Sequence, residues 1–129
     1  MISTATNKAI MRRVFEEGLN QGRIEVVDEL FSTQFIDHST PEQIAGVEGV
    51  KNYFATVRNG FPDMQVSIED IVAEGEMVVV RTTWRGTHLG IYDGVPASGR
   101  RVARTMIQIF RIVNSKIEEE WNEGGSLLS

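Results

Sequence analysis

Four ionisable side chains of this sequence are candidates for proton-transfer chemistry. Such chemistry needs a base that takes a proton and a donor that holds the developing negative charge. A carboxylate with apolar neighbours has the raised pKa that suits the first task. Asp37 and His38 lie together in the run FIDHS, where they could orient a substrate and exchange protons. The structural alternative is that this pair ties down a loop by hydrogen bonds.

The other two candidates lie in the second half of the chain. His88 opens a glycine-rich stretch, and it would either face a pocket or pin that stretch in place. Arg104 lies in a long apolar run. A buried arginine needs a partner, so its guanidinium would hold a substrate oxyanion or a carboxylate; otherwise Arg104 lies on the surface or at a dimer face.

Composition and motifs argue against several other kinds of chemistry. The two histidines are far apart, cysteine is absent and no HExxH spacing occurs, so we expect no metal site. Neither a GxGxxG after a strand nor a phosphate loop is present, so we expect no cofactor. A net charge of −5 disfavours nucleic acid and acidic membranes, no apolar run could span a bilayer, and the first residues lack a signal-peptide core. These features suit a cytoplasmic protein.

The segment from Val102 to Trp121 has the strongest local pattern. Its β-branched and apolar residues predict a long strand, a tight turn at Asn114-Ser115 and a return strand. Arg104 and Gln108 share one apolar face of the outgoing strand, and Arg111 lies on the other face. Polar groups on two largely apolar faces indicate a sheet that is covered on both sides, with a polar hollow on one of them.

In the return strand we expect successive side chains to alternate between the two faces. This places Ile117, Glu119 and Trp121 on one face, so Glu119 is the expected inward member of the run of three glutamates.

The remaining elements predict an α+β fold in one domain of residues 1–129. Apolar residues at helical spacing predict helices over 4–20, about 24–31 and about 47–58, with Thr6 or Asn7 as the first N-cap. Residues 35–39 form a short extended piece, followed by a loop that holds Pro41. Alternation begins at Met64, with a hairpin turn at Gly75-Glu76, and residues 86–101 form a long, mobile connection. We expect the three helices to cover one face of a curved, mainly antiparallel sheet.

Aromatic residues could line the hollow for a flat, ring-bearing ligand. Aromatics at such spacing are more often core residues, so we expect one or two of the four to touch a ligand. The four are Tyr53, Phe54, Trp84 and Trp121.

These pieces together resemble a known family, the SnoaL-like polyketide cyclases of the nuclear transport factor two-like (cystatin-like) cone fold. The matching segments, in order, are FIDHS at 35–39, GVEG at 46–49, FPD at 61–63, GTHLG at 86–90, GVPASG at 94–99, FRI at 110–112 and KIEEEW at 116–121. The resemblance implies a cone with a deep, mostly apolar pocket and a homodimer through the outer sheet face. It also implies intramolecular aldol chemistry by an acid/base carboxylate, without metal or cofactor.

The sequence departs from the family pattern at one position. In the cyclases an aspartate follows the last-strand tryptophan by four positions, but here that position is Gly125. Glu123 is the nearest carboxylate of the same parity, and we expect it to take the acid/base role. Epoxide hydrolases of this fold would match Glu123 by position, but they need an Arg-x-Asp pair and Arg104-Thr105-Met106 lacks the aspartate.

The resemblance therefore predicts a cofactor-free cyclase or isomerase acting on a hydrophobic carbonyl compound. Glu123 would be the acid/base, with His38, His88 or Arg104 stabilising charge. The alternative is a non-catalytic small-molecule-binding protein of the same fold, which Gly125 favours. A subunit of a larger assembly, with its pocket filled by its own side chains, is a third possibility.

Overall fold

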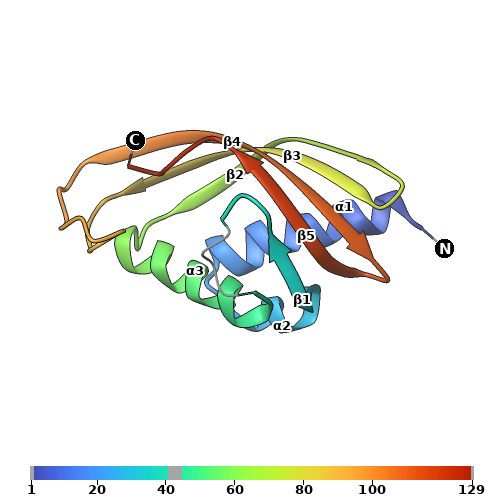
Figure 1. The fold of residues 1–129 in the computed structure, drawn as a ribbon. Coiled ribbons are helices and arrows are strands. Elements are labelled where there is room, and N and C mark those ends of the chain that lie inside the picture. Colours follow the sequence, from blue (N-terminus) through green and yellow to red (C-terminus); the bar gives the residue numbers. More distant parts are fainter. Residues whose placement is uncertain (1, 41–44, 129) are drawn as a thin grey trace.

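Helices cover the concave face of a five-stranded sheet in the computed structural model, which describes residues 2–40 and 45–128 (Figure 1). The expected loop at Pro41 lies outside the described residues. The elements are α1 (Thr4–Arg13), continued by the π-helical η1 (Val14–Asn20), α2 (Glu25–Leu30), β1 (Phe31–Asp37), α3 (Val47–Gly60), β2 (Gln65–Glu74), β3 (Met77–Thr87), β4 (Arg101–Val113) and β5 (Lys116–Glu123). Counting α1 with η1 as one helix, the three predicted helices are present.

The sheet has the order β1-β5-β4-β3-β2, and only the β1–β5 pair is parallel. The mainly antiparallel prediction is therefore confirmed, and both predicted turns occur. Asn114 and Ser115 have φ angles of 50° and 63°, the left-handed conformation that two-residue hairpin turns favour. The connection after β3 contains only the isolated bridge between Tyr92 and Val95, so it is not a strand, as predicted.

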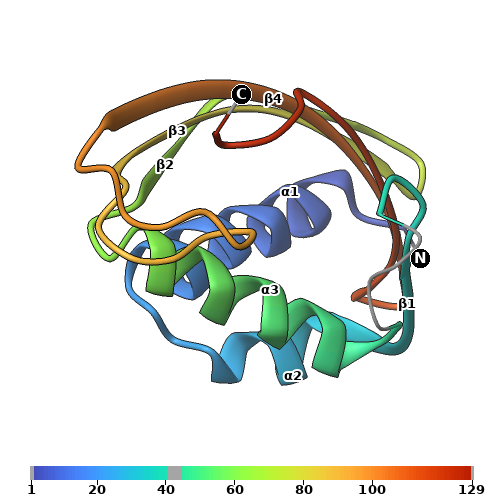
Figure 2. The same ribbon diagram turned by 60° about the vertical axis from the view of Figure 1, so that its left-hand side comes forward.

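Curvature of the sheet creates the space that the helices fill. Figure 2 shows β3 and β4 arching over α1 and α3, with β5 and β1 descending at one side. Phe15 of η1 packs edge-on against Trp84 and Phe110, with ring centroids 6.3 and 6.4 Å apart, and these three side chains are 1–2% exposed. The inner sheet face and the helices thus share one apolar core, which the large buried area stabilises.

The N-cap of the first helix lies three residues before Thr6, the nearer of its two predicted caps. Ser3 is the N-cap, and its hydroxyl accepts a hydrogen bond of 3.1 Å from the backbone N–H of Thr6. Thr6 and Asn7 lie within the helix, so the prediction that one of them caps it is wrong.

A β-bulge in β5 decides which glutamate faces the helices. Arg111 pairs with Glu119 and Ile112 pairs with Ile117, so Glu118 is an extra residue without a partner on β4. Beyond the bulge Glu120 pairs with the buried Phe110 and shares its inward direction. Glu119 and Trp121 point to the outer face. The prediction that Glu119 points inward is wrong, because simple alternation does not allow for the extra residue.

We expect deletion of Glu118 to preserve the fold. The deletion removes the unpaired residue and leaves both flanking pairs in register, so Glu120 stays on the inner face. The midpoint of thermal unfolding should stay within roughly 5 °C of the unmodified protein. Deletion of Ile109, from the regular part of β4, would invert the alternation and should abolish cooperative unfolding. Equal damage from both deletions would contradict this account of β5.

Candidate active site

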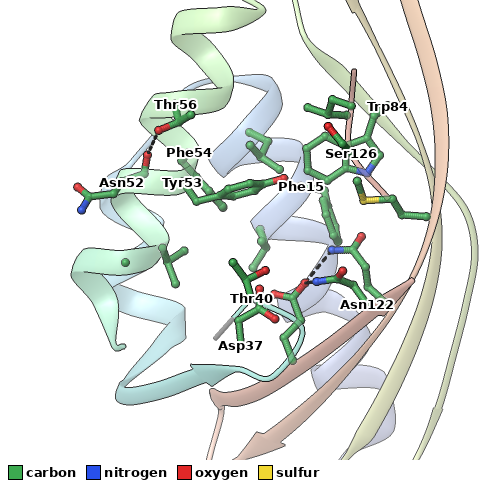
Figure 3. A pocket seen from close by; sticks show the side chains of 18 of the residues that line it. Phe15, Asp37, Thr40, Asn52, Tyr53, Phe54, Thr56, Trp84, Asn122 and Ser126 are labelled. Carbon is green, nitrogen blue, oxygen red and sulfur yellow. Dashed lines mark hydrogen bonds between the residues drawn. The ribbon is translucent and has the colours of Figure 1, made fainter. Parts of the chain in front are cut away.

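A cavity of about 450 Å³ lies between the helices and the inner face of the sheet (Figure 3). This volume is within the range of small-molecule sites. Aromatic and aliphatic side chains form much of its wall, with polar side chains among them, and Gln108, Glu120 and Asn122 form a connected polar group. The lining residues used below are Phe15, Asp37, Tyr53, Phe54, Trp84, Tyr92, Gln108, Glu120 and Asn122.

Glu120 carries the most perturbed carboxyl group of this cavity. The amides of Gln108 and Asn122 donate hydrogen bonds of 3.1 and 3.2 Å to its Oε2 atom. Burial raises the pKa of Glu120 to about 7, and the nearby Asp37 adds to this effect, while the two amides oppose it. The group is therefore near half ionisation at neutral pH, where a carboxyl is best suited to both accept and return a proton.

Asp37 brings a second carboxyl to the same end of the cavity. It is aligned with Glu120 across the parallel β1–β5 pair, and Figure 3 shows it beside Thr40 on the cavity floor. Burial raises its pKa, although the backbone N–H of Ser39 donates to Oδ1 at 2.9 Å. Two neighbouring carboxyls favour a state in which one proton remains on the pair.

Backbone contacts at the end of β1 hold the two carboxyls together. The N–H of His38 donates to the Glu120 carbonyl at 2.9 Å. The Ser39 hydroxyl both accepts from the Asn122 N–H at 2.8 Å and donates to the Asn122 carbonyl at 3.2 Å. The strands that carry Asp37 and Glu120 are therefore held together by a backbone hydrogen bond and by the short Ser39 side chain.

Two tyrosines supply hydroxyl groups to the cavity opposite the carboxyls. Tyr53 of α3 and Tyr92 of the connection after β3 both line the cavity, and each affects the pKa of the other. Burial raises the pKa of Tyr53 well above its ordinary value, and Tyr92, Glu120 and Asp37 contribute further. Burial also raises the pKa of Tyr92 to about 12. Both phenols stay protonated at neutral pH, so they can donate to a carbonyl or enolate oxygen.

Five of the predicted pocket residues line this cavity. They are Asp37, Tyr53, Phe54, Trp84 and Gln108. Figure 3 shows Tyr53 and Trp84 projecting from opposite walls toward the cavity. The predicted alternative for Asp37, a loop tie, also applies, because this residue accepts the Ser39 N–H while lining the cavity.

Glu123, the predicted acid/base residue, lies elsewhere. It pairs with Ile107 at the exposed end of β5, on the outer face of the sheet. Its side chain does not contribute to the cavity wall. The expected inward position of Glu123 is therefore wrong, for the same reason that Glu119 was misplaced: the bulge at Glu118 shifts the parity of the strand.

His38 and Trp121 also lie on the outer side. Their rings stack at 4.8 Å with an interplanar angle of 14°, and His38 Nε2 lies 2.9 Å from the Glu119 carboxylate. That carboxylate also accepts from Arg111 Nε at 2.7 Å, and the two partners lower the pKa of Glu119, His38 most. Neither ring reaches the cavity, although we expected both there. Arg111 forms salt bridges with Glu76 and Glu119 on the face of β4 opposite Gln108, as its predicted position indicated.

His88 pins the connection after β3, one of its two predicted roles. The ring is 1% exposed, stacks on Phe61 at 5.4 Å and has Nδ1 3.0 Å from the Ser98 hydroxyl. Its backbone N–H donates to the Arg100 carbonyl, and its carbonyl accepts from the Gly99 N–H. The segment is thereby anchored at both ends, and His88 does not line the cavity.

Arg104 occupies the predicted face of β4 but does not reach the cavity. It pairs with Trp84 in register, yet its Nη1 donates to the adjacent Ala103 carbonyl at 3.1 Å. It is absent from the cavity wall.

Sequence reasoning missed Glu120, Asn122 and Tyr92. Glu120 and Asn122 lie on the same face of β5. Simple alternation predicts that this face points to solvent, because it does not allow for the bulge. Tyr92 lies in a glycine-rich segment whose path only the folded structure shows.

The described residues 2–40 and 45–128 contain no cluster of three or more acidic, histidine or cysteine side chains arranged to hold a metal. Within the same ranges, no helix is both long and apolar enough to cross a membrane.

The curved sheet, its helical cover and the enclosed cavity define a cone-shaped α+β protein of the nuclear transport factor two-like class, as the sequence predicted. Within this class the chain belongs to the SnoaL-like polyketide cyclase family, whose family model matches residues 9–124.

Individual relatives agree with this assignment. Aklanonic acid methyl ester cyclase DnrD of Streptomyces peucetius is 28% identical over 120 residues, which cover 89% of this chain and 81% of the relative. The structure of TsrD from Streptomyces laurentii superposes with a TM-score of 0.89 at 26% identity, covering 96% of this chain and 91% of that one. IdmH from Streptomyces antibioticus gives a TM-score of 0.77 at 28% identity, covering 91% and 90%.

Burial of Glu120 predicts a pH-dependent cost to stability. Its pKa rises from 4.5 to about 7 on folding, so folding favours the protonated form. The stability that the folded state gains by keeping Glu120 protonated is fully present below pH 4.5 and is lost as the pH rises through 7. Glu120→Gln cannot ionise, so it does not lose this stability. The difference in unfolding free energy between the variant and the parent should therefore increase by about 3 kcal/mol, in favour of the variant, from pH 4.5 to pH 8.

Urea unfolding of the two proteins across this pH range measures the gap. Glu123→Gln is the matched control, because Glu123 is exposed on the outer face and should show no such trend. A parallel pair of stability profiles for Glu120→Gln and the parent would contradict a desolvated Glu120.

Proposed function

We propose that this protein is a cofactor-free cyclase that closes a ring in a polycyclic carbonyl compound by an intramolecular aldol step. The observation that carries the proposal is the Glu120 carboxyl, half ionised at neutral pH by burial, in an aromatic cavity that also holds phenol donors. The similarity to aklanonic acid methyl ester cyclase DnrD supports a polyketide ester as the substrate class.

The proposed reaction needs only a proton shuttle and an oxyanion donor. The ionised Glu120 removes a proton from a carbon next to a carbonyl group of the substrate. The resulting enolate carbon attacks a second carbonyl carbon of the same molecule, which forms the new C–C bond and leaves an alkoxide. Protonated Glu120 returns its proton to that alkoxide, so the enzyme ends in its starting state.

The remaining cavity residues support these steps in different ways. The protonated hydroxyls of Tyr53 and Tyr92 hold the enolate oxygen through hydrogen bonds. Asp37 raises the proton affinity of Glu120 by its nearby charge. Phe15, Phe54 and Trp84 offer flat apolar surfaces to the rings of the substrate. Glu120 thus replaces Glu123 in the proposed acid/base role, and it compensates for the glycine at position 125.

Replacement of Glu120 should separate this proposal from a binding-only role. With aklanonic acid methyl ester as the test substrate, Glu120→Gln should lower kcat by about 10²–10⁴-fold, because the variant has no proton-accepting group. Substrate binding should change little, since glutamine keeps the size of the side chain. For the parent protein, kcat/KM should rise with pH through about 7, as Glu120 ionises.

Glu123→Gln provides the control and should retain full activity. If the parent bound this ester and related polycyclic ketones tightly but formed no product, the non-catalytic alternative would replace our proposal. Loss of activity in Glu123→Gln but not in Glu120→Gln would reverse the assignment of the base.

We also propose that two copies of the protein form a homodimer through the outer faces of their sheets. Ile36, Val72 and Ile107 are 48–59% exposed, and their register places them on the face opposite the cavity. Ile107→Glu should convert a dimer to a monomer in light scattering, because it places a charge in an apolar interface. Leu89→Glu, at an exposed position beyond the sheet, should leave the dimer intact. A monomeric parent protein would refute the proposal.

A further inference from the structure

A chain of buried hydrogen bonds links the indole of Trp84 to the carboxyl of Glu120. Trp84 Nε1 donates to Thr82 Oγ1 at 3.0 Å, and Thr82 Oγ1 donates to Gln108 Oε1 at 3.1 Å. Gln108 Nε2 then donates to Glu120 Oε2 at 3.1 Å. The three residues before Glu120 are at most 6% exposed, so bulk water does not compete for the first two bonds, and the third is partly buried.

The directions of the three bonds in this chain agree with one another. An indole N–H can only donate, so the Thr82 oxygen accepts from Trp84. The single Thr82 hydrogen is donated to the Gln108 oxygen. The ionised Glu120 carboxylate can only accept, so it requires the Gln108 NH₂ group on its side. Thr82 and Glu120 therefore favour the same orientation of the Gln108 amide, and Trp84 supports it by holding the Thr82 oxygen.

This orientation makes the two oxygens of Glu120 unequal. Gln108 and Asn122 both donate to Oε2, and an oxygen that accepts two N–H donors is a poor place for a proton. Neither amide engages Oε1. A proton taken up by Glu120 is therefore placed on Oε1.

We propose that Thr82 and Trp84 are positioning residues of the active site, which fix the Gln108 amide so that Oε2 of Glu120 stays an acceptor and Oε1 carries the exchangeable proton. The catalytic role of that proton rests on the function proposed above, whereas the orientation of the amide does not. Without the Thr82 hydroxyl the Gln108 amide can also turn its oxygen toward Glu120, where it would accept a hydrogen bond from the protonated carboxyl in place of donating one to the charged form.

Other polar groups around Glu120 are not members of this hydrogen-bond chain, although Tyr53 packs against Trp84. Asp37 approaches from β1, Tyr53 from α3 and Tyr92 from the connection after β3. Asp93, the neighbour of Tyr92, also lines the cavity. Substitutions at Thr82 leave all four in place, so a change in the titration of Glu120 would report on the Gln108 amide.

The test is a carbon-13 NMR titration of the Glu120 carboxyl in glutamate-labelled protein, with Glu120→Gln used to assign the signal. Thr82→Val removes the hydroxyl and keeps the shape of the side chain. We expect its Glu120 midpoint to rise by about one pH unit, because a hydrogen bond to the charged form is lost. Thr82→Ser keeps the hydroxyl and should titrate like the parent. The pH midpoint of kcat/KM should move with the NMR midpoint, while KM at low pH changes little.

Thr82→Val also leaves the Trp84 N–H without its acceptor, which lowers stability. The double variant Thr82→Val/Trp84→Phe removes that donor as well and keeps the test valid if the single variant does not fold. An unchanged NMR midpoint in either folded variant, or an equal shift in Thr82→Ser, would overturn the proposal. An inactive parent protein would refute the proposed function but would leave the NMR result as a separate test of the chain.

Discussion

Removal of water from one carboxyl group is the physical constraint on which this structure depends. A charged Glu120 among aromatic side chains is costly, and the fold lowers that cost in only two ways: two amide donors at Oε2 and a pKa near 7 that lets the group become neutral. The two amides are paired with each other across β4 and β5, and Asp37, which adds to the raised pKa, is held in register with Glu120 across β1 and β5. A looser edge would admit water, and the carboxyl would revert to an ordinary surface acid.

The aromatic frame around the cavity has a mechanical role as well as a binding role. Phe15 packs edge-on against Trp84 and Phe110, and Tyr53 contacts both Phe54 and Trp84 with ring centroids 6.4 and 6.5 Å apart. Such contacts restrict side-chain rotation. The same residues that would bind a flat ligand therefore keep the cavity open, because rigid rings cannot collapse into it.

The outer face of the sheet contains a separate electrostatic system. Arg111 bridges Glu119 and Glu76, and Glu119 also meets His38. These groups are partly exposed and their ion pairs contribute little to stability. They hold Glu119 on the outer face directly after the β5 bulge. The next residue, Glu120, therefore points to the inner face. Adjacent glutamates thus have opposite environments within one strand.

Sequence by itself determined the elements, the α+β class, the family and five of the cavity residues. Helical and alternating periodicities are local properties, so they predicted the three helices, both hairpin turns and the inward positions of Trp84 and Gln108. Tertiary structure alone decided which acid enters the cavity. Three consecutive glutamates are chemically equivalent until a bulge shifts one of them, and the bulge lies between the apolar Ile112–Ile117 pair and the charged Arg111–Glu119 pair. Side chains alternate regularly between the two faces of a strand only while every residue is paired. One unpaired residue therefore turned Glu120 to the inner face and Glu119 and Trp121 to the outer face.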